Sequence, residues 1–304
     1  PPALLTPGSV AANQGLCAGD NPAQITESAP ATGGPGAYTY QWQYSTNVGG
    51  PFINIPSAVG FQYTPPAGAI STLYYRRMVT SGFCSPVYSN VIEIKVNPKP
   101  LAMLAGGETI CPAQTSILKV NMMVGTGPFT IDIENYPGVT ITAYTSGTDI
   151  IVTPAVTTTY KLLRVRDANG CEVVSPSANL NGTATIVVST LPSINTFTPS
   201  PAVCEFNLAT YKVKATGTNL TYQWFVNDGS GFTAVADGGT YFGATTPTLQ
   251  IFNSVRTMNL YIYHAVVTGC STSVTSDDGI FTVNTAPELT LHPSDVSVCF
   301  GNNT

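Results

Sequence analysis

Charged side chains are scarce in this chain of 304 residues. Only 9% of the residues are Asp, Glu, Lys or Arg, and the net charge is −5 with 11 Lys and Arg in total. Proteins that bind nucleic acids neutralise phosphates with clustered Lys and Arg, and this sequence has no basic run. The composition therefore argues against a nucleic-acid partner. Hydroxyl and amide groups must cover much of the surface, which is typical of β-rich extracellular modules.

Long apolar segments are also missing. No stretch approaches the roughly 20 residues that cross a bilayer as a helix. The opening "PPALLTPGSV" has neither the basic region nor the apolar run of a signal peptide. We therefore expect no transmembrane segment. We interpret the sequence as an internal or processed part of a longer protein, with any export signal or anchor outside it.

Motifs that carry chemistry are few. The chain has two histidines, His264 and His292, and it lacks C-x-x-C, a G-x-S-x-G elbow and a phosphate-binding glycine loop. A catalytic or zinc site needs side chains that converge, and two histidines far apart in the sequence do not indicate one. We expect no catalytic residues, no cofactor and no resident metal, so the chain is predicted not to be an enzyme.

Four carboxylates are weak candidates for a calcium site. Asp132 and Glu134 alternate in "TIDIEN", so both point to one face of a strand, and Asp277 and Asp278 precede a glycine in "SDDG". We favour a solvated strand face as the explanation of the first pair and turn chemistry as the explanation of the second.

Cysteines recur with a fixed period. Cys17, Cys111, Cys204 and Cys299 follow one another at nearly equal intervals, in "LCAGD", "ICPAQ", "VCEFN" and "VCFGN". A second series follows the first at similar distances, in "TSGFC", "DANGC" and "VTGC"; it comprises Cys84, Cys171 and Cys270. Such self-similarity indicates tandem repeats. We place them at 1–97, 98–190 and 191–285, with the start of a fourth, truncated repeat at 286–304.

Each repeat is predicted to be an immunoglobulin-like β-sandwich. Apolar residues alternate with period two in segments such as "TYKVKA" and "LYIYHAVV", and no segment has helical spacing. Six or seven short strands in about 94 residues are typical of that fold. We therefore expect an all-β chain of tandem antiparallel sandwiches arranged end to end. The expected core aromatic residues are Trp42, Phe129, Trp224 and Tyr263, with the second repeat divergent because it lacks Trp.

Several motifs resemble a known family. "YTYQWQYS", "YTPP", "YYRR", "VTSGFC" and the leading "CAG" are similar to the Ig-like tandem repeats of giant cell-surface proteins of the Bacteroidota, and "DANGC" resembles a motif of gliding adhesins in that group. The resemblance covers essentially the whole chain and implies type IX secretion, a cell-surface location and a part in adhesion or gliding motility. The second repeat departs from the pattern by lacking Trp.

The cysteine pairing has two solutions. Matched cysteines within each repeat favour Cys17 with Cys84, Cys111 with Cys171 and Cys204 with Cys270, leaving the partner of Cys299 outside the segment. In standard immunoglobulin topology, however, the two cysteines of a repeat lie at opposite ends of the sandwich, so pairing within a repeat requires a leading cysteine on a strand that doubles back. We expect the pairing within repeats, because first and second cysteines come in matched sets. The alternative links adjacent repeats, Cys17 with Cys171 and Cys111 with Cys270. Either arrangement indicates an oxidising compartment.

The sequence therefore predicts a disulfide-stabilised stalk in a large secreted cell-surface or filamentous protein. Its partners would be neighbouring repeats, with lateral self-association into fibres through edge strands as a variant. One alternative is a carbohydrate-binding array, in which Tyr241 and Phe242 of "GGTYFGATTP" form an exposed aromatic pair that contacts a surface polysaccharide. Another is a set of accessory domains of a secreted polysaccharide-degrading enzyme.

Overall fold

The computed structural model describes residues 3–285 and residue 287. The chain is all-β, with a single short 3₁₀ helix among the described residues, and it forms two compact units. One unit comprises Pro1–Glu108 and Thr115–Val187, and the other comprises Thr109–Gln114 and Val188–Thr304. The predicted opening of a fourth repeat, with His292 and Cys299, lies outside the described residues.

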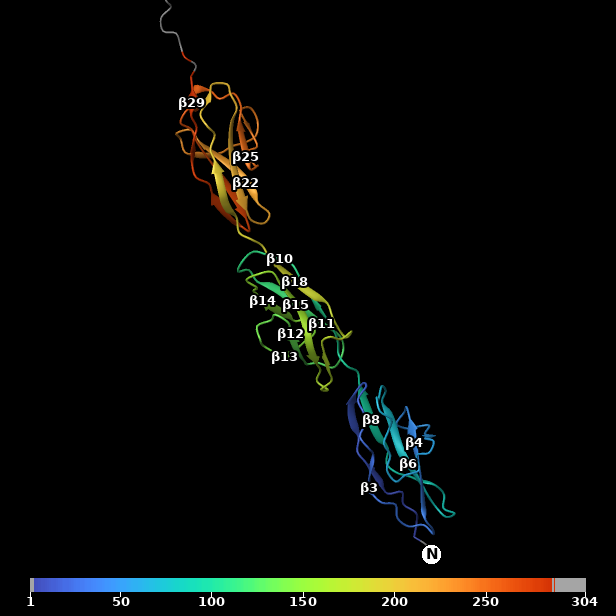
Figure 1. Ribbon diagram of the computed structural model, residues 1–304. Coiled ribbons are helices and arrows are strands. Elements are labelled where there is room, and N and C mark those ends of the chain that lie inside the picture. Colours follow the sequence, from blue (N-terminus) through green and yellow to red (C-terminus); the bar gives the residue numbers. More distant parts are fainter. Residues whose placement is uncertain (1–2, 286, 288–304) are drawn as a thin grey trace, which may run out of the picture. The chain divides into compact units, whose positions relative to one another are not determined.

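The first repeat is a sandwich whose main sheet has the order β2-β8-β6-β4-β5, with β7 beside β6 and a second small sheet of β1 and β3. Figure 1 shows β4, β6 and β8 side by side in the blue-to-cyan part of the ribbon. The strands are β1 (Ser9–Ala11), β2 (Gln14–Cys17), β3 (Thr26–Ala29), β4 (Tyr38–Ser45), β5 (Ile53–Asn54), β6 (Leu73–Ser81), β7 (Val87–Tyr88) and β8 (Ile92–Asn97).

The second repeat has a four-stranded sheet of order β14-β11-β9-β17 facing a sheet that contains β18-β15-β12-β13, with β16 beside β15. Its strands are β9 (Leu101–Ala105), β10 (Thr109–Ile110), β11 (Ser116–Val124), β12 (Phe129–Ile133), β13 (Ile141–Tyr144), β14 (Asp149–Val152), β15 (Thr158–Arg166), β16 (Glu172–Val174), β17 (Leu180–Asn181) and β18 (Thr183–Val188). The segment that carries β10 belongs to the other compact unit.

The third repeat has sheets of order β19-β21-β25-β24 and β23-β22-β26-β27, with β28 beside β26 and a parallel pair of β20 and β29. The elements are β19 (Ser193–Thr198), β20 (Val203–Cys204), β21 (Ala209–Thr216), β22 (Thr221–Asn227), β23 (Phe232–Ala234), β24 (Tyr241–Phe242), β25 (Thr248–Ile251), the 3₁₀ helix η1 (Arg256–Met258), β26 (Ile262–Gly269), β27 (Thr272–Thr275), β28 (Gly279–Ile280) and β29 (Val283–Asn284).

A tryptophan is fully buried in the core of the first repeat and of the third. Trp42 donates its indole N–H to the Gly60 carbonyl at 2.9 Å, and Trp224 donates to the Thr246 carbonyl at 2.8 Å. Trp224 stands opposite Ala265, a small buried residue on the neighbouring strand that leaves room for the indole. Phe129 is buried in the second repeat, and burial of these large rings supplies much of each core's apolar area.

Two neighbouring arginines of β6 have opposite environments. Because side chains alternate along a strand, Arg77 points into the core, where it is fully buried beside Glu27 at 2.6 Å. Its guanidinium also donates to the carbonyl of Phe61 at 2.7 Å. Arg76 faces outward, with the ring centroids of Phe52 and Tyr88 at 4.1 Å and 3.9 Å from its guanidinium carbon. A buried charge thus links β6 to β3 in the first repeat.

Candidate functional site: the disulfides between repeats

Two disulfides join successive repeats. Cys17 is bonded to Cys171 and Cys111 to Cys270, each with Cα atoms 5.4 Å apart, whereas Cys84 and Cys204 are free thiols. This corrects the expected within-repeat pairs Cys17–Cys84, Cys111–Cys171 and Cys204–Cys270. The alternative arrangement, between adjacent repeats, is the one observed.

Strand length explains the correction. In the first repeat, Cys17 pairs in register with Asn97 at the end of β8, and β8 runs antiparallel to β6, where Leu73 faces Ile94. Cys17 therefore lies near the beginning of β6, and Cys84 follows its end. The nine residues of β6 span about 30 Å. A disulfide tolerates Cα separations of at most about 7 Å.

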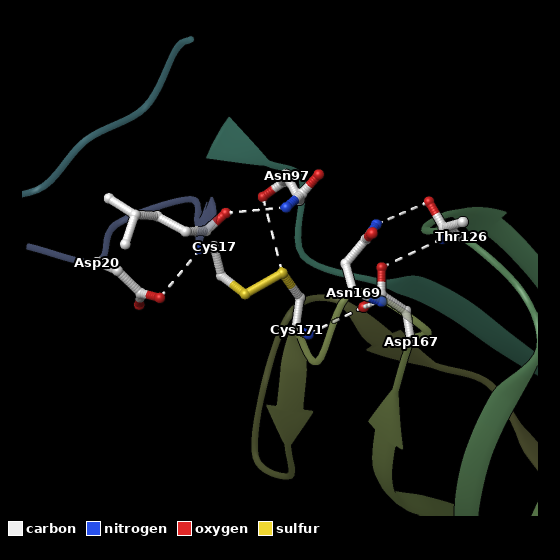
Figure 2. Close-up of a disulfide and its surroundings, with 8 residues drawn as sticks. Cys17, Asp20, Asn97, Thr126, Asp167, Asn169 and Cys171 are labelled. Carbon is white, nitrogen blue, oxygen red and sulfur yellow. Dashed lines mark hydrogen bonds between the residues drawn. A yellow bond between two sulfur atoms is a disulfide. The ribbon is translucent and has the colours of Figure 1, made fainter. Parts of the chain in front are cut away.

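The backbone around Cys17 forms a tight turn, which we call the leading turn (17–20). The carbonyl of Cys17 accepts a hydrogen bond from the Asp20 amide at 2.9 Å. The Asp20 carboxylate accepts one from the Cys17 amide at 3.0 Å (Figure 2). Gly19 completes the turn with φ +91°, a conformation that favours glycine. The parallel pairing of β2 with β8 and this turn together fix the direction of the Cys17 side chain.

Cys171 is presented by the hairpin between β15 and β16, and Asp167 organises that hairpin. Its carboxylate accepts hydrogen bonds from the amides of Cys171 at 2.9 Å, Asn169 at 3.0 Å and Thr126 at 3.2 Å (Figure 2). Asn169 also donates its side-chain amide to the Thr126 hydroxyl at 2.9 Å. The motif "DANGC" is therefore a rigid turn that holds a fully buried cysteine ready for pairing.

Asn97 connects the disulfide to the linker between the first two repeats. Its carbonyl oxygen lies 3.9 Å from the Cys171 sulfur, and its side chain donates to the Leu16 carbonyl at 3.3 Å (Figure 2). Only residues 98–100 separate β8 from β9. Two covalent connections, the linker and the disulfide, thus join these repeats at the same end. Sequence reasoning missed Asn97, although its position at the end of the unit's last strand was visible.

The second disulfide lies in the other compact unit. Cys111 begins a leading turn like that of Cys17: its carbonyl accepts from the Gln114 amide at 3.1 Å, and the Gln114 side chain accepts from the Cys111 amide at 2.9 Å. Ala113 has φ +64° where the first turn has glycine. Cys270 stands at the turn between β26 and β27. The same two local structures are joined in both disulfides.

Two of the four calcium candidates, Asp132 and Asp278, contact a basic side chain. Asp132 binds Arg164 at 2.7 Å. Burial alone would raise the pKa of the Asp132 carboxyl, but hydrogen bonds from Arg164 and Thr140, together with the positive charge of Arg164, lower it overall. Asp278 contacts His264 at 3.0 Å. Glu134 and Asp277 are not drawn into either contact. Within residues 3–285 and 287, no group of three or more His, Cys, Asp or Glu side chains is arranged to hold a metal ion.

The expected exposed aromatic pair divides between core and surface. Tyr241 and Phe242 are successive residues of β24, so they face opposite ways. Phe242 is 61% exposed. Tyr241 packs against the core, where its hydroxyl meets that of the fully buried Tyr263 at 3.0 Å. Burial raises the pKa of both phenols. The two rings therefore do not form a joint platform, which corrects that expectation.

One known family model is similar to part of this chain. It is described as "Domain of unknown function (DUF8696)" and matches residues 6–98, which is one repeat. The search of curated proteins found no match. Within the part of the chain that the structure describes, no helix has the length and apolar character needed to cross a membrane.

Solved structures similar to this chain are tandem immunoglobulin proteins. An I-band fragment from titin is 11% identical, with a TM-score of 0.51, and the match covers 93% of this chain and 99% of the fragment. Sidekick-1 immunoglobulin domains 1–5 are 12% identical over 94% of this chain and 60% of that one, with a TM-score of 0.41. Extracellular domains 3–5 of Drosophila OTK are 12% identical over 92% and 97%, with a TM-score of 0.34. The titin match together with the sheet order confirms the predicted fold class: the chain is built of tandem immunoglobulin-like β-sandwiches.

Proposed function

We propose that this chain is a stalk segment of a secreted cell-surface or filamentous protein, in which disulfides between successive repeats limit how far the chain can be extended. The observation that supports this role is the pairing itself. Each bond joins a leading turn to the hairpin cysteine of the next repeat, not to a cysteine of its own repeat. A bond within a repeat would limit the extension of that repeat alone, whereas a bond between two repeats also limits the extension of the linker that joins them.

The covalent path through the chain supports this mechanical role. Along the backbone, the path from Cys17 to Cys270 passes through every residue between them. Through the two disulfides, the path crosses from Cys17 to Cys171, returns along the backbone to Cys111, and crosses again to Cys270. Complete unravelling of the reduced chain therefore releases roughly 190 residues more than unravelling of the oxidised chain, and at about 3.3 to 3.6 Å per residue the difference is roughly 65 nm.

Single-molecule pulling on the whole chain, held at its two ends, tests this role. We expect the fully extended oxidised chain to be about 65 nm shorter than the same chain in a reducing buffer. A variant with Cys17→Ser and Cys111→Ser should reach the long limit without reductant. As a matched control, Cys84→Ser with Cys204→Ser removes two thiols that form no bond and should keep the short limit. Equal lengths with and without reductant would refute the proposal.

The location and lineage are part of the same proposal. Disulfides persist in oxidising compartments, so a protein that depends on them would work outside the cell. The Bacteroidota-like motifs support export by the type IX system and a part in adhesion or gliding, with surface polysaccharide or other copies as partners. A secretion assay of the native protein in a type IX-deficient strain tests this assignment, since continued appearance of the protein outside the cell would contradict it.

A further inference from the structure

Cys204 is unpaired and exposed, yet it occupies the same structural position as Cys17. In the first repeat, β2 pairs in parallel with β8, and Cys17 stands opposite Asn97. In the third repeat, β20 pairs in parallel with β29, and Cys204 stands opposite Asn284. The residue after each cysteine donates to that asparagine's carbonyl, at 2.9 Å from Ala18 and 3.1 Å from Glu205.

The turn that follows Cys204 also matches the leading turns of the bonded cysteines. The Cys204 carbonyl accepts from the Asn207 amide at 3.2 Å, as the Cys17 carbonyl accepts from Asp20. Phe206 has φ +65°, close to the +64° of Ala113, and its amide donates to the Ser254 carbonyl at 2.7 Å. The other two cysteines that the structure describes in such a turn, Cys17 and Cys111, form disulfides. The third copy therefore has the geometry of a half-cystine without its partner.

Exposed apolar side chains accompany Cys204. Phe206 is 70% exposed, and its amide donates to the carbonyl of Ser254, the residue before Val255, which is 37% exposed. Phe206 has a left-handed backbone conformation at the position where the bonded turns have glycine or alanine. This conformation is unfavourable for a bulky residue, which suggests that its ring has a function such as contact with another protein. Apolar side chains that stay exposed next to an unpaired cysteine would lose contact with water if another protein covered this turn.

The complementary half of such a bond is also present in this chain. Cys84 is a half-buried free thiol in the connection between β6 and β7, which corresponds to the hairpins that carry Cys171 and Cys270. Its neighbour Phe83 is fully exposed. Among the residues that the structure describes, one leading-turn cysteine, Cys204, and one hairpin cysteine, Cys84, are thus unpaired, and each is close in sequence to an exposed phenylalanine.

We propose that the face around Cys204 binds a further immunoglobulin-like repeat of the same kind and that Cys204 forms a disulfide with that repeat's hairpin cysteine. The bond forms by thiol–disulfide exchange with a small-molecule disulfide. The two thiols lose two protons and two electrons, and the small disulfide is reduced to two thiols. This inference extends the proposed function, because it continues the observed pairing rule beyond the two bonds already formed.

Two single-thiol variants of the whole chain test the proposal, with a second copy supplying the hairpin cysteine. Both have Cys299→Ser. One also has Cys84→Ser, so that Cys204 is its free thiol, and the other has Cys204→Ser, so that Cys84 is its free thiol. In a glutathione redox buffer, we expect the mixture to form the Cys204–Cys84 dimer at least tenfold faster than either variant forms a symmetric dimer. Peptide mapping identifies the bond and checks that both existing disulfides remain.

Phe206→Gly tests whether the surface as well as the thiol directs pairing. Glycine accepts the positive φ, so the turn is retained while the ring is lost. We expect this change to slow dimer formation at least threefold, whereas Phe242→Ser, which removes an exposed ring elsewhere in the same repeat, should have no effect. Symmetric dimers that form as fast as mixed ones, or no dimers at all, would overturn the proposal. The pulling experiment depends only on the two existing bonds, so the two proposals can fail separately.

Discussion

Loss of the Cys17–Cys171 bond should destabilise the first repeat much more than loss of an exposed cysteine normally does. When the first repeat unfolds while the second stays folded, the bond still holds Cys17 at Cys171 of the second repeat. Cys171 lies close to Asn97, the residue at which the linker between the repeats begins, so both ends of the unfolded segment stay near each other. The unfolded first repeat is thereby closed into a loop of about 80 residues, for which the loop-closure relation gives an entropy loss of about 15 cal/mol/K, or about 4.5 kcal/mol at 25 °C. A bond between two repeats thus stabilises the earlier one as an internal bond would.

The measurement uses Cys17→Ser with Cys204→Ser as a matched control. Both cysteines begin the same kind of turn, but only Cys17 is bonded. Trp42 and Trp224 are the only tryptophans, so emission from Trp42 in a Trp224→Phe background reports the first repeat. With an m-value of about 2 kcal/mol/M, the urea midpoint should fall by about 2 M in Cys17→Ser and by less than about 0.3 M in Cys204→Ser.

Reducing conditions separate loop closure from side-chain packing. With the disulfides reduced, the chain without the Cys17 substitution should unfold at the midpoint of Cys17→Ser. If the two still differ by more than about 0.5 M in urea, the serine itself disturbs the turn and the loop-closure argument is wrong. Equal midpoints for Cys17→Ser and Cys204→Ser in oxidising buffer would refute it directly.

Three further predictions concern the cores. Glu27→Gln leaves the Arg77 guanidinium buried without its counter-charge and should destabilise the first repeat by about 3 kcal/mol, measured by Trp42 emission in urea. Burial raises the pKa of Tyr75 to about 12, whereas the unfolded chain ionises near pH 10. The free energy of unfolding of the first repeat should therefore fall by up to about 3 kcal/mol as the pH rises from 10 to 12, and urea unfolding of Tyr75→Phe should show a smaller fall. Gly243→Ala places a Cβ 2.2 Å from a backbone oxygen at φ +84° and should cost the third repeat about 3 kcal/mol, against about 1 kcal/mol for Gly229→Ala, whose Cβ meets nothing within 4 Å.

The fold was accessible from the sequence because its signals are local and repeated. Period-two alternation marks individual strands, and the spacing of Cys17, Cys111 and Cys204 marks the repeats. The same alternation predicts that Arg77 is buried, because Arg77 shares a strand face with Tyr75 and Val79. A charged residue on a core face is nevertheless unusual, so the pattern alone is easily read as placing it on the surface.

Cysteine pairing was harder because it depends on which end of a sandwich each cysteine occupies. Matched numbers of cysteines in a repeat say nothing about that, whereas the length of β6 does. The roles of Asn97 and Asp167 depend on contacts between segments that are far apart in the sequence, Asn97 with Cys171 and Asp167 with Thr126. No short-range pattern reveals these two contacts, although the turn chemistry of "DANGC" itself is visible in the sequence.

The pairing rule also affects how a gene for such an array can change its length. A leading-turn cysteine bonds to the hairpin cysteine of the following repeat, as Cys17 does with Cys171 and Cys111 with Cys270. If recombination inserts one whole repeat, the hairpin cysteine of the inserted repeat bonds to the leading-turn cysteine of the repeat before it. The leading-turn cysteine of the inserted repeat bonds to the hairpin cysteine of the repeat after it. If recombination removes one, the repeats on either side bond to each other. Arrays of different lengths therefore keep every interior cysteine paired, and unequal crossing-over can lengthen or shorten the protein without creating a reactive thiol inside it.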